Sequence, residues 1–472
     1  MIYEPIIGLE VHLQLSTRTK AFCGCRTSFG EAPNSRTCPV CLGLPGSLPV
    51  LNEKAFSYAI KTALALDCEI QGFVKFDRKN YYYPDLPKNF QISQYDKPLA
   101  YNGHVKIDAR EIRVKRVHLE EDAGKLIHEE GGSASFVDYN RAGTPLLEIV
   151  TEPDITSPAE AYDYLTRLKA ILEYLDVSLC DMEKGSLRCD ANISIRPEGE
   201  TALGPKVELK NMNTFKGVRE ALEYEVSRQT EVVNSGGSTF QETRLWDAEK
   251  RVTTSMRTKE DAHDYRYFPE PDLVPFIVDR ELIEGIRKTL PELPEARRGR
   301  FRERFGLSDY DAGVLVSGRA MADYFEECAA EYGSPKTIAN WITGEILNRM
   351  NLKKAGIRET APDPKNLAEL LKMIDSGQIS GKTAKDVLTE MIDTGAAPAG
   401  IVRAKGVSQI SDVKELEDTV AKVLENNKKS LDDYRAGKKN AFTYLVGQVM
   451  KETKGRANPK AVNEILNRRL KP

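Results

Sequence analysis

The sequence predicts an α+β protein, in which a largely antiparallel sheet is followed by a long helical part. Strand-like alternation of apolar and polar residues recurs up to about residue 290, and from there on the pattern is nearly all helical. Because each alternating strand has a single apolar face, we expect the sheet to be covered on that face only.

Two segments carry the alternation most clearly. In IIGLEVHLQL the apolar residues occupy every second position, and Glu10 and His12 lie on the opposite face. The segment SLRCDANISIR repeats this pattern, with Asp190 on its polar face. Both segments are therefore expected to be half-buried strands of the sheet.

A helix is predicted between these strands. Ser157 and Glu160 form a capping box around Pro158, and apolar residues then recur at helical spacing as far as Leu175. This helix is therefore expected to begin directly after Ser157.

The chain is long enough for two or three domains, since it has 472 residues. Two prolines mark Leu290–Pro294 as a linker, and a weaker composition change falls near Gly400–Ser408. We expect a sheet-based first domain at 1–292, a helical domain at 293–402 and a tail domain at 403–472.

Composition limits the class of protein. The net charge of −3 excludes a generally basic nucleic-acid binder but allows a local basic patch. Glu4 and Glu10 interrupt the apolar N-terminal segment, and no apolar run reaches the roughly 18 residues that suggest a membrane span. We therefore expect a cytoplasmic protein without membrane contact.

Four of the eight cysteines are clustered as two close pairs on turn-forming segments, within residues 23–41. This spacing is typical of a tetrahedral zinc site, and four thiolates leave no open position, so the zinc would be structural. The alternative is four free buried thiols. The proposed ligands are Cys23, Cys25, Cys38 and Cys41.

Acidic residues stand on several apolar strands. Glu148 is flanked by aliphatic residues, where a lone carboxylate is costly to bury unless it is paired or bound to metal. Further acids lie in His118–Asp122 and on two other alternating strands, at Asp190 and Glu208. Oxygen ligands with one imidazole suit Mg²⁺ or Mn²⁺, but the same acids could be solvent-exposed on a half-wet sheet.

Two loops resemble phosphate-binding elements. The basic and aromatic segment FDRKNYYYPD, which includes Lys79, could hold phosphates or a nucleic-acid end, or could be a turn with packed tyrosines. The segment Gly377–Thr383 has one residue too few for a P-loop and follows a helix, so Ser380 is interpreted as a turn residue or helix cap.

The C-terminal residues are strongly basic in a chain that is negative overall. Between Arg435 and Lys471 only Glu452 and Glu464 oppose the basic side chains, and the net charge is +8. This asymmetry suggests a polyanionic partner, although a solvated helix face would have a similar composition.

Several long strings, taken together, resemble the motifs of the B subunits of tRNA-dependent amidotransferases. They follow one another in fixed order along essentially the whole chain, and the tail resembles that family's YqeY-like domain. The strings are IIGLEVHLQL, PNSRTCPVCLGLPGSLPVLN, KFDRKNYYYPDLPKNFQISQYD, HLEEDAGK, DYNRAGTPLLEIVTEPD, GSLRCDANISIR, VELKNMN and DYRYFPEPDL.

The resemblance implies a glutamine-synthetase-like cradle domain and an ATP-dependent ligase activity. The side-chain carboxylate of misacylated Glu-tRNA(Gln) or Asp-tRNA(Asn) would be phosphorylated and then amidated. The ammonia would come from glutamine hydrolysed in a partner amidase (glutaminase) subunit, the A subunit of the complex. A small C subunit would complete a heterotrimer.

The resemblance also implies site residues. Lys79 and Arg188 would face the phosphates of ATP, and Glu121 and Asp190 would belong to the catalytic set. The cysteine quartet matches family members that bind zinc, whereas other members lack it. The implied Mg²⁺ or Mn²⁺ ligands are Glu10, His12, Glu121, Glu148, Asp190 and Glu208.

Two other functions compete with this interpretation. A zinc-bearing tRNA adaptor with a decayed site would not need the full acidic set and Lys79. A stand-alone phosphotransferase acting on a small acid would not need the basic tail.

Overall fold

The computed structural model describes residues 2–108, 110–128, 134–258, 265–407, 413–435, 438–453, 457 and 459–470. The chain divides into two compact units, Met1–Pro294 and Glu295–Pro472. Within the expected linker Leu290–Pro294, the residues before Pro294 belong to no helix or strand. The finer division into three domains stays a prediction.

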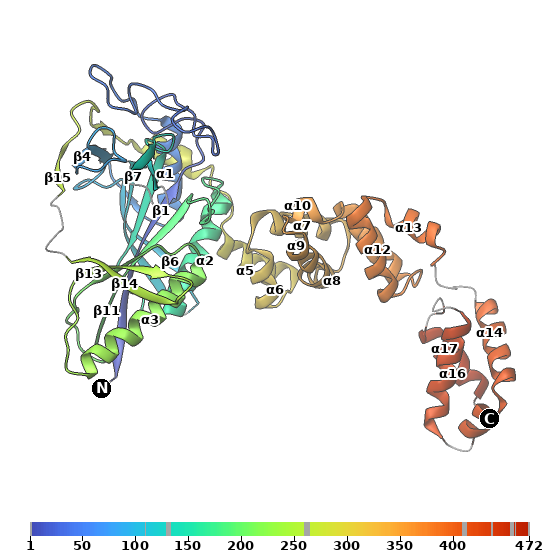
Figure 1. Ribbon diagram of the computed structural model, residues 1–472. Coiled ribbons are helices and arrows are strands. Elements are labelled where there is room, and N and C mark those ends of the chain that lie inside the picture. Colours follow the sequence, from blue (N-terminus) through green and yellow to red (C-terminus); the bar gives the residue numbers. More distant parts are fainter. Residues whose placement is uncertain are drawn as a thin grey trace. The chain divides into compact units, whose positions relative to one another are not determined.

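The first unit is built on a nine-stranded sheet (Figure 1). All neighbouring strands pair antiparallel except β12 and β13, which run parallel, so the predicted α+β class with a largely antiparallel sheet is confirmed. In spatial order the strands are β14 (Val252–Thr258), β13 (Glu242–Asp247), β12 (Val207–Lys210), β11 (Leu187–Pro197), β1 (Tyr3–Gln14), β10 (Pro145–Thr151), β7 (Glu111–Glu121), β6 (Ala100–Lys106) and β2 (Glu69–Ile70).

One face of this sheet is covered by helices. The apolar residues of β1, from Ile7 to Leu13, are fully buried and join one core with residues of α1 (Glu53–Ala65), α2 (Pro158–Leu175) and α3 (Phe215–Asn234). Helix α2 begins as predicted, with the Ser157 side chain accepting a hydrogen bond from the backbone of Glu160. The other face of the central strands keeps polar side chains.

Short strands and one helix complete the first unit. A three-stranded sheet joins β15 (Arg266–Pro269), β4 (Asp77–Asn80) and β5 (Phe90–Ser93), and β5 packs against β7. The remaining elements are β3 (Phe73–Val74) paired with β16 (Phe276–Ile277), β8 (Lys125–His128) paired with β9 (Ser135–Asp138), and α4 (Arg280–Arg287).

The described part of the second unit is helical, as predicted. Ser380 caps the N-terminus of α12, so it is a helix cap and not part of a phosphate loop. No helix within the described ranges is long and apolar enough to cross a membrane. The helices are α5 (Pro294–Phe305), α6 (Asp309–Leu315), α7 (Arg319–Glu331), α8 (Pro335–Trp341), the π-helical turn η2 (Ile342–Ile346), α9 (Leu347–Lys353), α10 (Ile357–Thr360), α11 (Pro364–Asp375), α12 (Gly381–Thr394), α13 (Pro398–Lys405), α14 (Val413–Asn426), α15 (Lys428–Arg435), α16 (Lys439–Glu452) and α17 (Pro459–Leu470).

The last four helices share a small core of their own. Leu416 and Val420 of α14 cluster with Leu445 of α16 and Leu466 of α17. Several basic residues that motivated the predicted polyanion contact, such as Lys454 and Arg456, lie outside the described residues.

Candidate functional site

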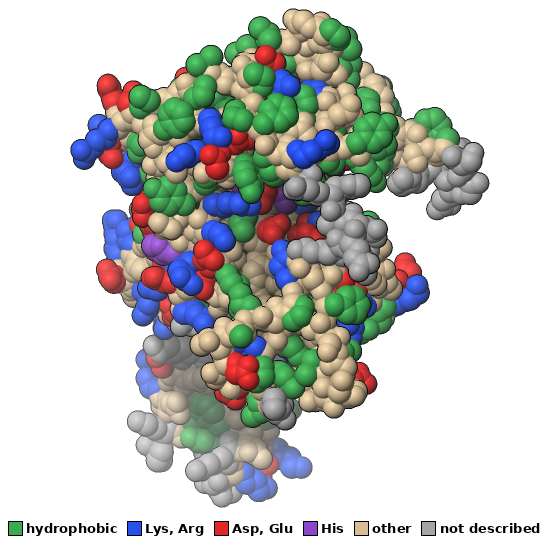
Figure 2. Space-filling view, turned by 90° about the vertical axis from the view of Figure 1, so that its left-hand side faces the viewer, with side chains coloured by type: hydrophobic (Ala, Val, Ile, Leu, Met, Phe, Trp, Pro, Cys, Tyr) green, Lys and Arg blue, Asp and Glu red, His purple; other side chains and the backbone are tan. Residues whose placement is uncertain are grey.

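The polar face of the central sheet brings charged side chains from four strands together in two adjacent rows. Strand pairing sets His12 of β1 opposite Glu148 of β10, and Glu148 opposite His118 of β7. On the other side of β1, Glu10 lies opposite Asp190 of β11. Directly opposed residues of antiparallel strands stand about 5 Å apart on the same face, so His118, Glu148 and His12 form one row, and Glu10 and Asp190 belong to the next row along the strands. Figure 2 shows acidic, basic and histidine side chains gathered in a depression of the first unit.

Two histidines and two glutamates converge on this face. His12 Nε2 lies 3.5 Å from Glu148 Oε2 and 4.0 Å from Glu120 Oε1. His118 Nε2 lies 3.1 Å from Glu148 Oε2 and 3.4 Å from Glu120 Oε2. One ligand atom from each of His12, Glu120 and Glu148 falls within 4.8 Å of the other two. Two carboxylates and an imidazole fit a hard divalent cation such as Mg²⁺ or Mn²⁺.

Burial and mutual attraction shift the protonation of this group in opposite directions. Burial alone would lower the pKa of His118, but the adjacent Glu148 and Glu120 carboxylates outweigh it and raise the pKa to about 9. Burial alone would raise the pKa of Glu148, but His118 and His12 hold it well below its usual range. Without metal, therefore, the carboxylates are ionised and neutralised by imidazolium charge.

Glu121 lies apart from this cluster. Its carboxylate pairs with Lys88 and accepts a hydrogen bond of 3.0 Å from the backbone nitrogen of Ile92. Successive residues of a strand point to opposite faces, so Glu120 and Glu121 at the end of β7 diverge. The structure thus brings Glu120, and not the expected Glu121, to His12 and Glu148.

The other three acids implied as metal ligands lie further along the same face. Lys210 Nζ is 2.9 Å from Asp190 Oδ2 and 3.1 Å from Glu208 Oε1. Glu10 accepts a hydrogen bond of 2.9 Å from the Asn192 side chain. The six predicted ligands are therefore split among three environments, although all but Glu121 share the polar face of the sheet.

Arg188 is positioned beside the histidine cluster. It stands opposite His12 in the strand pairing and donates a hydrogen bond of 2.8 Å to Asp122 Oδ2. Its Nε is buried and has no hydrogen-bond partner among the described residues. Arg188 thus offers an unused donor near the cluster.

Lys79 lies among tyrosines. Its Nζ is 4.7 Å from the centre of the Tyr265 ring, and within the described ranges no carboxylate lies at ion-pair distance. Nearby, Tyr95 and Tyr267 stack with their ring centres 4.0 Å apart. Cation and rings together suit a phosphate and a base.

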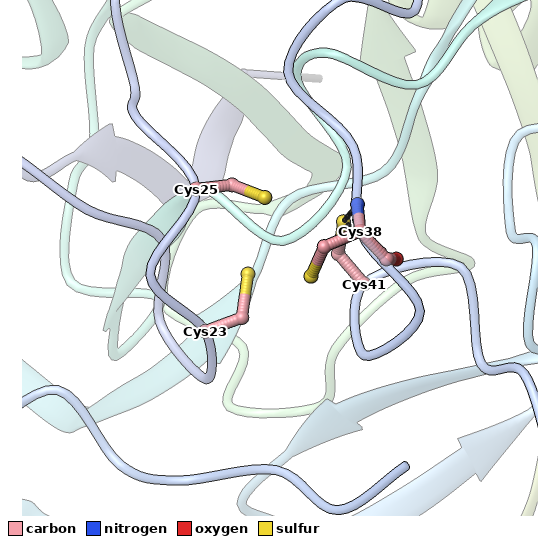
Figure 3. A group of neighbouring side chains, drawn as sticks. All are labelled: Cys23, Cys25, Cys38 and Cys41. Atoms are coloured by element: carbon pink, nitrogen blue, oxygen red, sulfur yellow. Dashed lines mark hydrogen bonds between the residues drawn. The ribbon is translucent and has the colours of Figure 1, made fainter.

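The four clustered cysteines meet around a common point, as Figure 3 shows. One sulfur from each lies within 4.8 Å of the others, although the two pairs are separated in sequence. The contact with Cys41, together with burial, raises the pKa of the Cys23 thiol. The same contact with Cys23 is the main reason why the pKa of Cys41 falls to about 4. The quartet fits a tetrahedral thiolate site.

A buried lysine adjoins these cysteines. Lys20 has no solvent exposure, and its Nζ lies 3.6 Å from Cys41 Sγ and 3.2 Å from the carbonyl oxygen of Tyr139. A buried ammonium is costly unless it is paired. Cys41 therefore supplies a compensating negative charge when it is a thiolate.

A cavity of about 260 Å³ lies between the cysteine loop and the β4–β5 strands. Lys20, Cys41 and Gly143 line one part, and Lys88 and Glu121 line another. Several apolar side chains line it as well, so its walls combine charged and apolar groups.

Sequence reasoning missed Glu120 as a partner of His12, and it missed His118, Lys210 and Lys20 altogether. One usable indication existed, because period-two alternation places His118 and Glu120 on the same face of their strand, with Glu121 on the other. For Lys20 the sequence offers no such indication, since it lies in a loop.

The fold and the candidate site together define the class of this protein, which consists of two units. An α+β unit carries carboxylates and histidines on the open face of its sheet, and a helical unit follows it. Comparison with known proteins is more specific. Residues 5–284 match the model of the GatB/GatE catalytic domain, and residues 323–470 match the model of the GatB domain.

Full-length relatives are similar along the whole chain. A protein of Caldanaerobacter subterraneus is 57% identical over 474 residues, covering 100% of both chains, and one of Carboxydothermus hydrogenoformans is 56% identical, covering 99% of both. One of Brevibacillus brevis is 52% identical, covering 98% of both. Each is named as the B subunit of an aspartyl/glutamyl-tRNA(Asn/Gln) amidotransferase. The chain belongs to this family of amidotransferase B subunits, which confirms the resemblance found in its motifs.

Proposed function

We propose that this chain is the subunit that amidates misacylated tRNA in a glutamine-dependent amidotransferase ligase. It uses ATP to phosphorylate the side-chain carboxylate of Glu-tRNA(Gln), Asp-tRNA(Asn) or both, and ammonia then displaces phosphate. The amidase partner supplies the ammonia, and the small third chain completes the cytoplasmic heterotrimer. The first unit would have the glutamine-synthetase-like cradle fold, and residues 403–472 the YqeY-like fold.

The observation that carries this proposal is the cluster of His12, Glu120 and Glu148 on the polar face of the sheet. Carboxylates are poor electrophiles, so amidation requires prior phosphorylation, which needs positive charge near the transferred phosphoryl group. A divalent ion held there would offset that charge. The cluster shares His12 and Glu148 with the family-implied set and contains Glu120 where Glu121 was expected. The other implied acids lie outside the cluster.

Residues of the chain itself perform the remaining tasks. Arg188 adjoins the cluster with an unpaired Nε, and can donate a hydrogen bond to a phosphate oxygen. Lys79 lies against Tyr265 with no carboxylate partner among the described residues, so its charge is available to a phosphate. Glu10, Asp190 and Glu208 form a second acidic group, where Lys210 would have to move for a cation to bind.

The cysteine quartet would hold a structural zinc ion. Its four sulfurs leave no position for substrate, so the zinc would order the loop of residues 23–41 and would take no part in amidation. The neighbouring cavity, which Glu121 and Lys88 line, is a sheltered space for a small polar reactant.

The test is reconstitution of the heterotrimer with each misacylated tRNA, scored separately for ATP cleavage, amide formation and glutamine hydrolysis. Glu148→Gln keeps the packing but removes the charge, and is expected to abolish ATP cleavage and amide formation. A basal rate of glutamine hydrolysis, performed by the amidase partner, should remain. Amide formation at the unaltered rate in Glu148→Gln and Asp190→Asn would contradict the proposed site.

A further inference from the structure

The two oxygens of the Glu120 carboxylate have different surroundings. Oε1 is turned towards His12, at 4.0 Å. Oε2 accepts a hydrogen bond of 2.9 Å from Ser93 Oγ and lies 3.4 Å from His118 Nε2. One oxygen is therefore held by the protein, and the other faces the group of candidate metal ligands.

His118 is almost completely buried, at 3% exposure, between the two carboxylates. Its Nε2 lies within 3.4 Å of both, whereas its Nδ1 has no hydrogen-bond partner among the described residues. The carboxylate oxygens that face Nε2 can only accept, so the ring hydrogen is assigned to Nε2, which lies between the two carboxylates. A buried Nδ1 without a hydrogen-bond partner costs free energy, so an apolar residue would fill this part of the core at lower cost than His118.

The two histidines play different parts in this geometry. His12 belongs with Glu120 and Glu148 to the group whose ligand atoms have metal-ligand spacing, and His118 is not a member of that group. The side chain of His12 is partly exposed, at 22%, whereas that of His118 is 4% exposed. His12 is thus on the open side of the carboxylate pair and His118 on the closed side.

We propose that His118, together with Ser93, is a positioning residue that holds the inner carboxylate oxygen so that Glu120 presents Oε1 to a divalent cation beside His12. This inference rests on the proposed function of the His12–Glu120–Glu148 cluster. Partners that orient metal-ligating carboxylates commonly contribute 10- to 100-fold to metal affinity. No titration of the histidine is required, because the effect comes from hydrogen-bond direction.

The experiment measures Mn²⁺ binding to the full chain in its heterotrimer, by electron paramagnetic resonance, for five substitutions, of which His12→Ala tests the site itself. His118→Ala should weaken binding by about 10- to 100-fold. His118→Gln places an amide donor near the position of Nε2 and should restore most of the affinity. Ser93→Ala removes only a hydroxyl and should also weaken Mn²⁺ binding. This variant tests the proposal if His118→Ala fails to fold. His104→Gln, at an exposed histidine that pairs with Asp67, is the matched control and should bind as the unaltered chain does.

Electron spin-echo modulation by imidazole nitrogen distinguishes positioning from direct ligation. The signal of one coordinated histidine is expected, and it should persist in His118→Gln. Its loss in that variant would make His118 a ligand, and equal affinity in His118→Ala, Ser93→Ala and the unaltered chain would show no positioning role; either result overturns the inference. A heterotrimer that binds no Mn²⁺, or whose binding survives His12→Ala, would instead overturn the proposed site, and this inference with it.

Discussion

Exchanging either of two adjacent glutamates for glutamine should lower stability in a different way, because the end of β7 directs Glu120 and Glu121 to different sites. Stabilisation by a bound ion grows with its concentration relative to Kd, and amounts to about 2.7 kcal/mol at 100 times Kd. If Glu120→Gln raises the Kd for Mg²⁺ by about 100-fold, that stabilisation falls to about 0.4 kcal/mol at the same concentration. Glu120→Gln should therefore lose nearly all Mg²⁺-dependent stability.

Glu121→Gln should instead lower stability whether or not Mg²⁺ is present. The Lys88–Glu121 pair is buried, with side-chain exposures of 10% and 4%, and removing one partner of such a pair costs about 3–5 kcal/mol. Glutamine can still accept the hydrogen bond from the Ile92 backbone, so we expect about 3 kcal/mol. The Mg²⁺-dependent part should stay intact.

The assay is denaturant unfolding of both variants and the unaltered chain, with Mg²⁺ absent and at 100 times the Kd of the unaltered chain. The two substitutions are chemically identical and lie at neighbouring positions, so each variant is the control for the other. Loss of the Mg²⁺ effect in Glu121→Gln, with its retention in Glu120→Gln, would refute the geometric reasoning and favour the set implied by family resemblance.

Three further predictions concern other parts of the chain. Purified protein should contain about one zinc ion per chain, and Cys38→Ser should lose it, because structural zinc contributes roughly 10–16 kcal/mol to small modules; elemental analysis that finds no zinc would contradict this. Deleting residues from 408 onward should raise the KM for misacylated tRNA and spare glutamine hydrolysis, and steady-state kinetics with an unchanged KM would exclude a tRNA contact in the tail. Glu225→Gln should lower stability at pH 7 by about 3 kcal/mol, since the buried Glu225 pairs with Arg228. Burial alone would raise the pKa of Glu225, but Arg228 and neighbouring donors lower it below 4.5. The stability lost in Glu225→Gln should therefore become smaller as the pH falls below 4.5, and urea unfolding at pH 7 and below pH 4.5 measures this change.

Local patterns in the sequence were sufficient for much of the fold. Alternation identified β1 and β11 as half-buried strands, because period-two side-chain direction is a property of any extended chain. The cap at Ser157 and the capping role of Ser380 were also readable, since a helix N-terminus needs acceptors close in sequence.

The candidate site could be predicted only in part from such local sequence patterns. Sequence alone singled out His12 and Glu148, because each is polar on a strand otherwise suited to burial. That these two residues face each other depends on the pairing of β1 with β10, two strands that lie far apart along the chain. The choice of Glu120 over Glu121 further depends on how the end of β7 meets β5.

The sequence by itself thus determined which residues alternate, which cap helices and which cysteines lie close enough along the chain to form pairs. Only the tertiary structure decided that His118 lies between Glu120 and Glu148, that Lys210 joins Asp190 to Glu208, and that Lys20 is buried against Cys41. The physical reason is that side-chain direction follows from local backbone geometry, whereas a partner across the sheet follows from strand register. Register is selected by the burial of whole apolar faces, a property of the assembled core that no short segment contains.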